Sequence, residues 1–116
     1  MSDATIYHNP NCGTSRTVLA ALRDAGHAPT VVEYLKTGWT ADQLRGLLTA
    51  MDASPRDILR TKGGAAAEAG LLAPDVTDDA LIAAMVANPA LVERPIVSTP
   101  KGVRLCRPAD TVRELL

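Results

Sequence analysis

The chain has 116 residues with a formal net charge of −1 at pH 7, and only 3% of its residues are aromatic. This length fits one ordinary domain that can bury an aliphatic core without disulfide bridges, and the near-zero charge gives no field that favours nucleic acid or a membrane surface as a partner. Two cysteines are too few for a disulfide framework, and no signal peptide or apolar run of membrane-spanning length occurs, so we expect a cytoplasmic protein in a reducing compartment.

The first third of the chain predicts a β-α-β unit. Residues 5–7 read as a short strand, and apolar residues at helical spacing predict a helix from 13 or 14 to 24 or 25, which Gly26 ends. Residues 30–35 are rich in β-forming side chains and predict a second strand. This order implies a parallel pair of strands joined by a right-handed crossover.

Residues 40–90 predict a mostly helical block. Thr40 and Gln43 form a capping box before an apolar helical face, and Pro55 marks the first turn of another helix. A short helix is expected at 65–69, and Thr77 caps the last helix of the block. The stripe that this last helix buries is predicted to consist of Leu81, Ile82, Met85 and Val86.

The C-terminal part predicts a β-hairpin followed by a helix. Strands are expected over 96–98 and 103–105, and a last helix starts near Pro108. The whole chain, 1–116, therefore predicts a single α/β domain. It consists of a small, mixed four-stranded sheet flanked by helices, with a helical insertion at about 40–90.

This order of elements resembles the thioredoxin-like fold. In that fold a cysteine motif lies between the first strand and the first helix, and a proline precedes the third strand. Cys12 and Pro95 stand at these two places. The resemblance implies a cis peptide bond before Pro95, a conformation that only about 5–6% of X-Pro bonds adopt in folded proteins.

Cys12 lies at the turn between the first strand and the first helix. At a helix N-terminus the backbone N–H groups lack intrahelical partners and carry a partial positive charge, which favours a thiolate and also binds anions. Arg16 adds a positive charge one turn on, and His8 can add another from the strand end. Such surroundings lower a cysteine pKa from roughly 8.5 to about 3.5–7.5. We therefore expect Cys12 to be a nucleophile beside a pocket for a negatively charged substrate.

Several other kinds of cysteine site do not fit the sequence. Ser15 stands where a dithiol redox motif would carry its second cysteine, and Val18 stands where a tyrosine-phosphatase-like loop would carry its arginine. The histidines and cysteines show no metal-ligand spacing, so we expect no metal site. Cys106 is expected to be a buried structural thiol.

Several motifs resemble those of the glutaredoxin-linked arsenate reductases. The segment 7–16, Tyr-His-Asn-Pro-Asn-Cys-Gly-Thr-Ser-Arg, is similar to the active-site segment of that family. The other similar motifs are Ile-Leu-Arg at 58–60, Thr-Asp-Asp at 77–79, Glu-Arg-Pro-Ile at 93–96, where the family has Asn-Arg-Pro-Ile, and Arg-Leu-Cys-Arg-Pro at 104–108. The resemblance runs from residue 4 to the C-terminus.

The resemblance implies a role for each matching residue. Cys12 would be the catalytic nucleophile that attacks arsenic, His8 would help to keep it ionised, and Pro95 would support the site. The residues implied in binding the oxyanion are Arg60, Arg94, Arg107, Gly13, Thr14, Ser15 and Arg16. The family binds no cofactor. Glutathione is its co-substrate, a glutaredoxin supplies further electrons, and arsenite is released.

Two other functions remain open on the sequence. One is a redox-responsive regulator of the same fold that binds RNA polymerase, but such regulators typically carry the second cysteine that Ser15 replaces here, and Arg107 is not expected in them. The other is a monothiol, glutaredoxin-like protein that acts on glutathione mixed disulfides. That reading explains Cys12 but leaves three arginines without a role.

Overall fold

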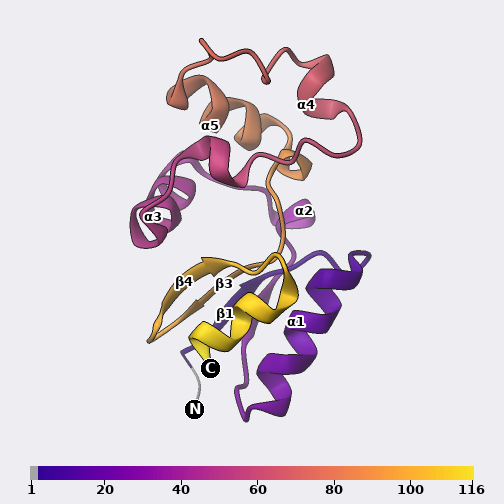
Figure 1. Cartoon of the computed structure of the whole chain (residues 1–116), viewed down its shortest axis with the longest axis vertical. Coiled ribbons are helices and arrows are strands. Elements are labelled where there is room, and N and C mark those ends of the chain that lie inside the picture. The colour runs from indigo at the N-terminus through magenta and orange to yellow at the C-terminus, as the bar shows by residue number, and fades with distance from the viewer. Residues whose placement is uncertain (1–2) are drawn as a thin grey trace. The chain divides into compact units, whose positions relative to one another are not determined.

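The computed structural model describes residues 3–116, which divide into two compact units (Figure 1). The first unit combines residues 3–37 with 94–116, and the second spans Gly38–Glu93. The second unit covers nearly the same residues as the helical insertion predicted at about 40–90. Within residues 3–116, none of the helices combines the length and the apolar character that crossing a membrane requires.

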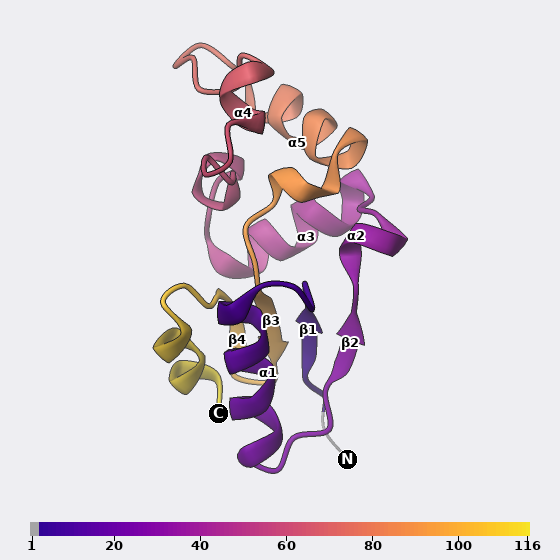
Figure 2. The same ribbon diagram turned by 90° about the vertical axis from the view of Figure 1, so that its right-hand side faces the viewer.

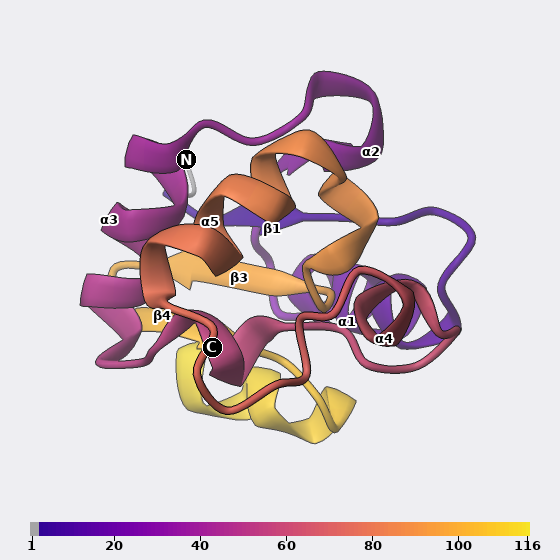
Figure 3. The same ribbon diagram turned by 90° about the horizontal axis from the view of Figure 1, so that it is seen from above.

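The first unit is built on a mixed four-stranded sheet in the order β2-β1-β3-β4. The strands are β1 (Thr5–Tyr7), β2 (Thr30–Val32), β3 (Ile96–Thr99) and β4 (Gly102–Leu105). β1 runs parallel to β2 and antiparallel to β3, while β3 and β4 form an antiparallel hairpin and lie side by side in Figure 3. The predicted parallel pair and the predicted hairpin are both confirmed.

Two helices cover one face of this sheet (Figure 2). They are α1 (Gly13–Asp24) and the 3-10 helix η3 (Ala109–Leu115), which pack against each other. The buried cluster beneath them consists of Ile6, Val18, Leu22, Val97, Cys106, Val112 and Leu115. Gly26 adopts a φ of +92°, and the next N–H, that of His27, donates to the carbonyl of Leu22, so α1 ends at the predicted glycine.

The second strand is shorter than predicted. It ends at Val32, and a single helical turn, α2 (Tyr34–Thr37), follows. The N–H groups of Lys36 and Thr37 both donate to the carbonyl of Glu33, which turns the chain away from the sheet. Tertiary packing overrides the β propensity of this segment, because Tyr34 is buried in the turn.

The second unit is helical, as predicted. Its elements are α3 (Ala41–Met51), the 3-10 helix η1 (Pro55–Ile58), α4 (Ala65–Glu68), α5 (Asp78–Ala87) and the 3-10 helix η2 (Pro89–Leu91). The hydroxyl of Thr40 accepts from the N–H of Gln43, and the Gln43 side chain accepts from the N–H of Thr40, so the capping box is confirmed. Val86 was predicted to be buried on α5, but it is 38% exposed, so that assignment is wrong.

Candidate active site at the Cys12 turn

Cys12 is the N-cap residue of α1, as the sequence predicts. Its φ of −98° and ψ of 121° are extended, and its carbonyl accepts the first helical hydrogen bond from Arg16 at 3.0 Å. The N–H of Cys12 donates to the carbonyl of Asn9 at 3.0 Å, which closes the preceding turn. The side chain of Cys12 is half-buried. The thiol is therefore held at the helix start and remains accessible.

A buried polar network holds this turn in place. The hydroxyl of Ser15 accepts from the N–H of Asn9 at 3.1 Å and lies 2.6 Å from Nδ1 of His8. The Asn9 side chain accepts from the N–H of Asn11 at 2.9 Å, so Asn9 organises the loop as an Asx turn. His8, Asn9 and Ser15 are all buried. Sequence reasoning left Asn9 without a role, although its place before Pro10 and Asn11 is a recognisable turn signal.

His8 does not supply the positive charge expected of it. Burial lowers the pKa of its imidazole, and the positive charges of Arg23 and Arg16 act in the same direction, while Glu33 opposes them. Since the ordinary pKa is 6.5, the ring is neutral at pH 7. The contact of His8 with the cysteine turn runs through Ser15, whose backbone N–H faces the sulfur.

Two guanidinium groups meet at the Cys12 sulfur. Nη1 of Arg107 lies 3.8 Å from Sγ of Cys12 and donates to the carbonyl of Arg94 at 3.0 Å. The Arg94 side chain also lies close enough to lower the pKa of the Cys12 thiol. The Arg94–Pro95 peptide bond is cis, as the thioredoxin-like resemblance implies, and the Arg107–Pro108 bond is also cis, which was not predicted.

Arg94 carries a further donor that faces no partner. Its Nε is buried and makes no hydrogen bond among residues 3–116. Buried donors are nearly always paired, so an orphaned one asks for an explanation such as an absent ligand. An anion held beside the Cys12 sulfur would satisfy this group.

Burial and the neighbouring hydrogen-bond donors shift the pKa of the Cys12 thiol in opposite directions. Burial raises it, but the backbone N–H of Ser15 and the side chains of Arg94 and Arg107 outweigh burial and lower the pKa from 9.0 to about 7. The thiolate is therefore far more accessible near neutral pH than that of an ordinary cysteine. Arg16, which was expected to contribute, instead donates to the carbonyl of Pro10 at 2.9 Å and is not among the main causes.

The second cysteine is inert by comparison. Cys106 is completely buried, and burial, with a smaller contribution from Glu114, raises its pKa to about 12. Its sulfur lies 3.8 Å from the carbonyl of Arg104. These surroundings agree with the predicted structural thiol, because a neutral buried thiol is a poor nucleophile.

Arg60 belongs to the second unit and forms an ion pair there. Its Nη1 lies 2.6 Å from Oε1 of Glu93, and the two side chains are only 17% and 21% exposed. Backbone bonds clamp the pair: the N–H of Arg60 donates to Leu91 at 2.7 Å, and the N–H of Glu93 donates to Ile58 at 2.8 Å. The sequence motif at 93–96 gave no sign of this contact, because the two residues are 33 positions apart.

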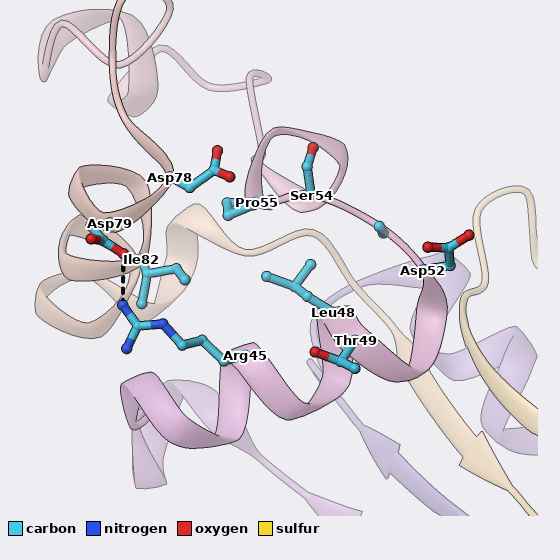
Figure 4. Close-up of a pocket in the computed structure, with 10 residues that line it drawn as sticks. Arg45, Leu48, Thr49, Asp52, Ser54, Pro55, Asp78, Asp79 and Ile82 are labelled. Atoms are coloured by element: carbon cyan, nitrogen blue, oxygen red, sulfur yellow. Dashed lines mark hydrogen bonds and ion pairs between the residues drawn. The ribbon is translucent and has the colours of Figure 1, made fainter.

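The second unit also holds a groove of about 530 Å³ between α3, the loop before η1 and the start of α5 (Figure 4). Leu48, Pro55 and Ile82 provide its apolar surface, and Arg45 pairs with Asp79 across it at 2.9 Å. The groove contains neither a thiol nor a histidine. Within residues 3–116, no group of three or more His, Cys, Asp or Glu side chains is arranged to hold a metal ion.

Comparison with known proteins identifies the family. The chain is 58% identical to an arsenate reductase (ArsI2) of Synechocystis sp. over 96% of its own length and 79% of that protein. It is 48% identical to an arsenate reductase of Escherichia coli (strain K12), over 100% of the chain and 82% of that protein.

The structure gives the same result. An arsenate reductase from Vibrio cholerae superposes with a TM-score of 0.92 at 39% identity, covering 97% of each chain, which confirms the predicted thioredoxin-like fold. The sequence profile of the ArsC family matches residues 7–115, nearly the whole length over which the motifs were found to be similar. The chain belongs to the ArsC family.

Proposed function

We propose that this protein reduces arsenate to arsenite and so serves in arsenic detoxification. The observation that carries the proposal is the convergence of Arg94 and Arg107 on Cys12, whose pKa the backbone N–H of Ser15 and these two arginines lower to about 7. Relatives at 58% and 48% identity are named arsenate reductases, which supports the same reaction. The reaction also matches the site, because a thiolate flanked by guanidinium groups suits a tetrahedral oxyanion.

In the first step, the Cys12 thiolate attacks arsenic in arsenate. A sulfur–arsenic bond forms as one arsenic–oxygen bond breaks, and the hydroxide that leaves takes up a proton from solvent to become water. The adduct is Cys–S–AsO(OH)2, with arsenic still in the +5 state. Arg94 and Arg107 hold the oxyanion, and the buried Nε of Arg94 gains the hydrogen bond that it lacks in the free protein. The N-terminal turn of α1, residues 13–16, contributes backbone N–H groups to the same anion.

The role of Arg60 in oxyanion binding rests on the Ile-Leu-Arg motif at 58–60 that resembles the family. Its pairing with Glu93 leaves Nε and Nη2 without a hydrogen bond among residues 3–116. A planar guanidinium can hold a carboxylate on one edge and an oxyanion on another. We propose that Glu93 orients Arg60 in this way.

The electrons come from outside the chain. Reduction of arsenate needs two electrons, the Cys12 turn offers one thiol, and Cys106 is buried with a pKa of about 12. We propose glutathione as the co-substrate and a glutaredoxin as the protein that restores Cys12, as the family resemblance implies. Such reductants are available in the cytoplasm, where we propose that the protein acts.

A coupled assay tests this function. Arsenate, glutathione, glutaredoxin and glutathione reductase are mixed with the protein, and NADPH consumption is followed. We expect consumption that depends on arsenate and is lost in Cys12→Ser but retained in Cys106→Ser. If the wild-type protein gives no arsenate-dependent signal with any thiol donor, the proposed function is wrong.

A further inference from the structure

The side chains of Asn9 and Arg16 lie in the segment around Cys12, but the function proposed above gives them no part in the reaction. Asn9 is only 5% exposed, and polar side chains buried to this extent are nearly always hydrogen-bonded. Arg16 was expected to lower the pKa of Cys12, yet it is not among the main causes of that shift. Hydrogen bonds to the turn before Cys12 give both side chains a different role.

Residues 9–12 form the turn that carries the chain from β1 into α1. The N–H of Cys12 donates to the carbonyl of Asn9 at 3.0 Å and closes this turn. That bond does not involve the central peptide, the unit that joins Pro10 to Asn11. Rotation of the central peptide is what distinguishes one type of β-turn from another, so the closing bond alone does not fix the shape of the turn.

Two side chains hold the central peptide from opposite ends. Its N–H, from Asn11, donates to Oδ1 of Asn9 at 2.9 Å. Its carbonyl, from Pro10, accepts from Nη1 of Arg16, also at 2.9 Å. Rotation of the peptide would break both bonds. Because Arg16 belongs to the first turn of α1, its bond also ties the turn to the helix that follows it.

The position of the thiol depends on the shape of this turn. The N–H of Asn9 donates to the hydroxyl of Ser15 at 3.1 Å, and the backbone N–H of Ser15 is one of the groups that stabilise the Cys12 thiolate. Nη1 of Arg107 lies 3.8 Å from the Cys12 sulfur. Hydrogen bonds weaken steeply as their geometry departs from the ideal, so a displacement of Cys12 at the end of the turn would weaken both contacts.

We propose that Asn9 and Arg16 are positioning residues, which hold the central peptide of the turn and so keep the Cys12 sulfur against its hydrogen-bond donors. Neither side chain needs to touch the substrate, because Asn9 acts through the N–H of Asn11 and Arg16 through the carbonyl of Pro10. The effect on turnover rests on the proposed function, whereas the effect on the sulfur is measured without arsenate.

The pH dependence of iodoacetamide labelling tests the role of Asn9, with Cys106→Ser in every variant so that one thiol remains. Asn9→Ala should raise the inflection above about 7, by roughly 0.4–1 pKa unit. Asn9→Ser should restore part of this change, because a serine hydroxyl makes the same kind of turn more weakly. Asn11→Ala is the matched control, since Asn11 is exposed and bonds to Asn9 through its backbone. A substitution that only lowers the stability of the fold leaves the inflection of the folded protein unchanged.

A double variant tests whether the two side chains act on the same peptide. Arg16→Ala should also raise the inflection, whereas Arg23→Ala, which removes an exposed arginine further along α1, should not. Asn9→Ala combined with Arg16→Ala should raise it by clearly less than the sum of the two single changes, because either loss frees the same peptide. Asn9→Ser replaces Asn9→Ala in this series if the alanine variant does not fold.

Steady-state kinetics connect the turn to the reaction. Asn9→Ala and Arg16→Ala should each lower kcat for arsenate about three- to tenfold. The KM should change little, because Arg94 and Arg107 are intact. An unchanged inflection in Asn9→Ala and Asn9→Ser, or additive changes in the double variant, would overturn the proposal. If the inflections shift as expected but the wild-type protein does not reduce arsenate, the positioning role stands and the proposed function fails.

Discussion

At the scale of single residues, the chemistry of this protein depends on how the charge of the Cys12 thiolate is stabilised. The groups that lower its pKa are the N–H of Ser15, three residues away, and the guanidiniums of Arg94 and Arg107, which are remote in sequence. Because these groups outweigh burial, the thiolate and the oxyanion site share the same two arginines. Substitutions of Arg94 or Arg107 should therefore change both the reactivity of the thiol and the binding of the substrate.

The pKa of Cys12 predicts how alkylation depends on pH. The rate of iodoacetamide labelling should rise through an inflection near pH 7 and level off above it, because only the thiolate reacts. The measurement is made in Cys106→Ser, so that one thiol remains. The same shift also affects stability. Since the pKa of the folded state lies below the ordinary value of 9.0, it contributes stability that is fully present above pH 9 and is lost as the pH falls through about 7. An inflection near 9 would contradict the electrostatic account.

Because Arg94 and Arg107 act on both the substrate and the Cys12 sulfur, we predict that removing either one weakens arsenate reduction and raises the pKa of Cys12 together. Arg94→Ala and Arg107→Ala should each lower kcat/KM for arsenate about tenfold to a hundredfold, since a hydrogen bond to a charged group is worth roughly 1.5–3 kcal/mol. Each should also raise the pKa of Cys12 in the labelling assay. Lysine at either position should restore activity only in part, because an ammonium cannot make a bidentate contact. Arg113→Ala serves as the control. If both active-site variants reduced arsenate with wild-type kinetics, the proposed oxyanion site would be wrong.

At the scale of elements, the cysteine turn owes its shape to the first turn of α1 and the end of β1. The buried Ser15 hydroxyl joins them through the N–H of Asn9 and Nδ1 of His8. Ser15→Ala would leave the N–H of Asn9 without its partner inside the protein. An unsatisfied buried donor costs about 1–3 kcal/mol.

Urea unfolding measures this cost. We expect Ser15→Ala to lower the free energy of unfolding by about 1–3 kcal/mol, and to raise the labelling pKa of Cys12 because the backbone N–H of Ser15 loses its fixed position. Thr17→Ala is the matched control, since Thr17 is an exposed hydroxyl residue on the same helix. Equal midpoints for the two variants would show that the network does not stabilise the turn.

At the scale of the whole molecule, the first unit is assembled from both ends of the chain. Ile6 of β1 and Leu115 of η3 belong to the same buried cluster, although they are near opposite ends of the sequence. The hydroxyl of Thr99 donates to the carbonyl of Leu115 at 3.0 Å, and the Lys101 ammonium bonds to the carbonyl of Leu116. The last helix therefore closes the core that supports the Cys12 turn.

This arrangement predicts that a substitution near the C-terminus affects the whole unit. Leu115→Ala should lower the free energy of unfolding by about 2–5 kcal/mol, the usual cost of removing a buried leucine side chain. Leu72→Ala is the control, because Leu72 is 48% exposed. Thermal or urea unfolding compares the two, and equal stability would mean that η3 is not part of the cooperative core.

The sequence by itself determined the features that depend on neighbours within a few residues. The placement of Cys12 at a helix start, the stop at Gly26 and the capping box at Thr40 follow from turn and cap chemistry. The parallel pair of strands and the β-hairpin also followed from the pattern of strands and turns, whereas the order of the four strands comes from the structure. The motifs also indicated the family, because several short runs of residues, from 7–16 to 104–108, resemble those of the family.

Only the tertiary structure decided which side chains from distant parts of the chain contact one another. Arg107 reaches the Cys12 sulfur across 95 positions of sequence, and Arg60 meets Glu93 across 33. His8 was expected to be able to add a positive charge, but burial, which no local pattern reports, lowers the pKa of its imidazole and disfavours that charge. Helix caps and turns are set by contacts between residues close in sequence, whereas pKa values and ion pairs depend on burial and on side chains that meet only when distant segments pack together.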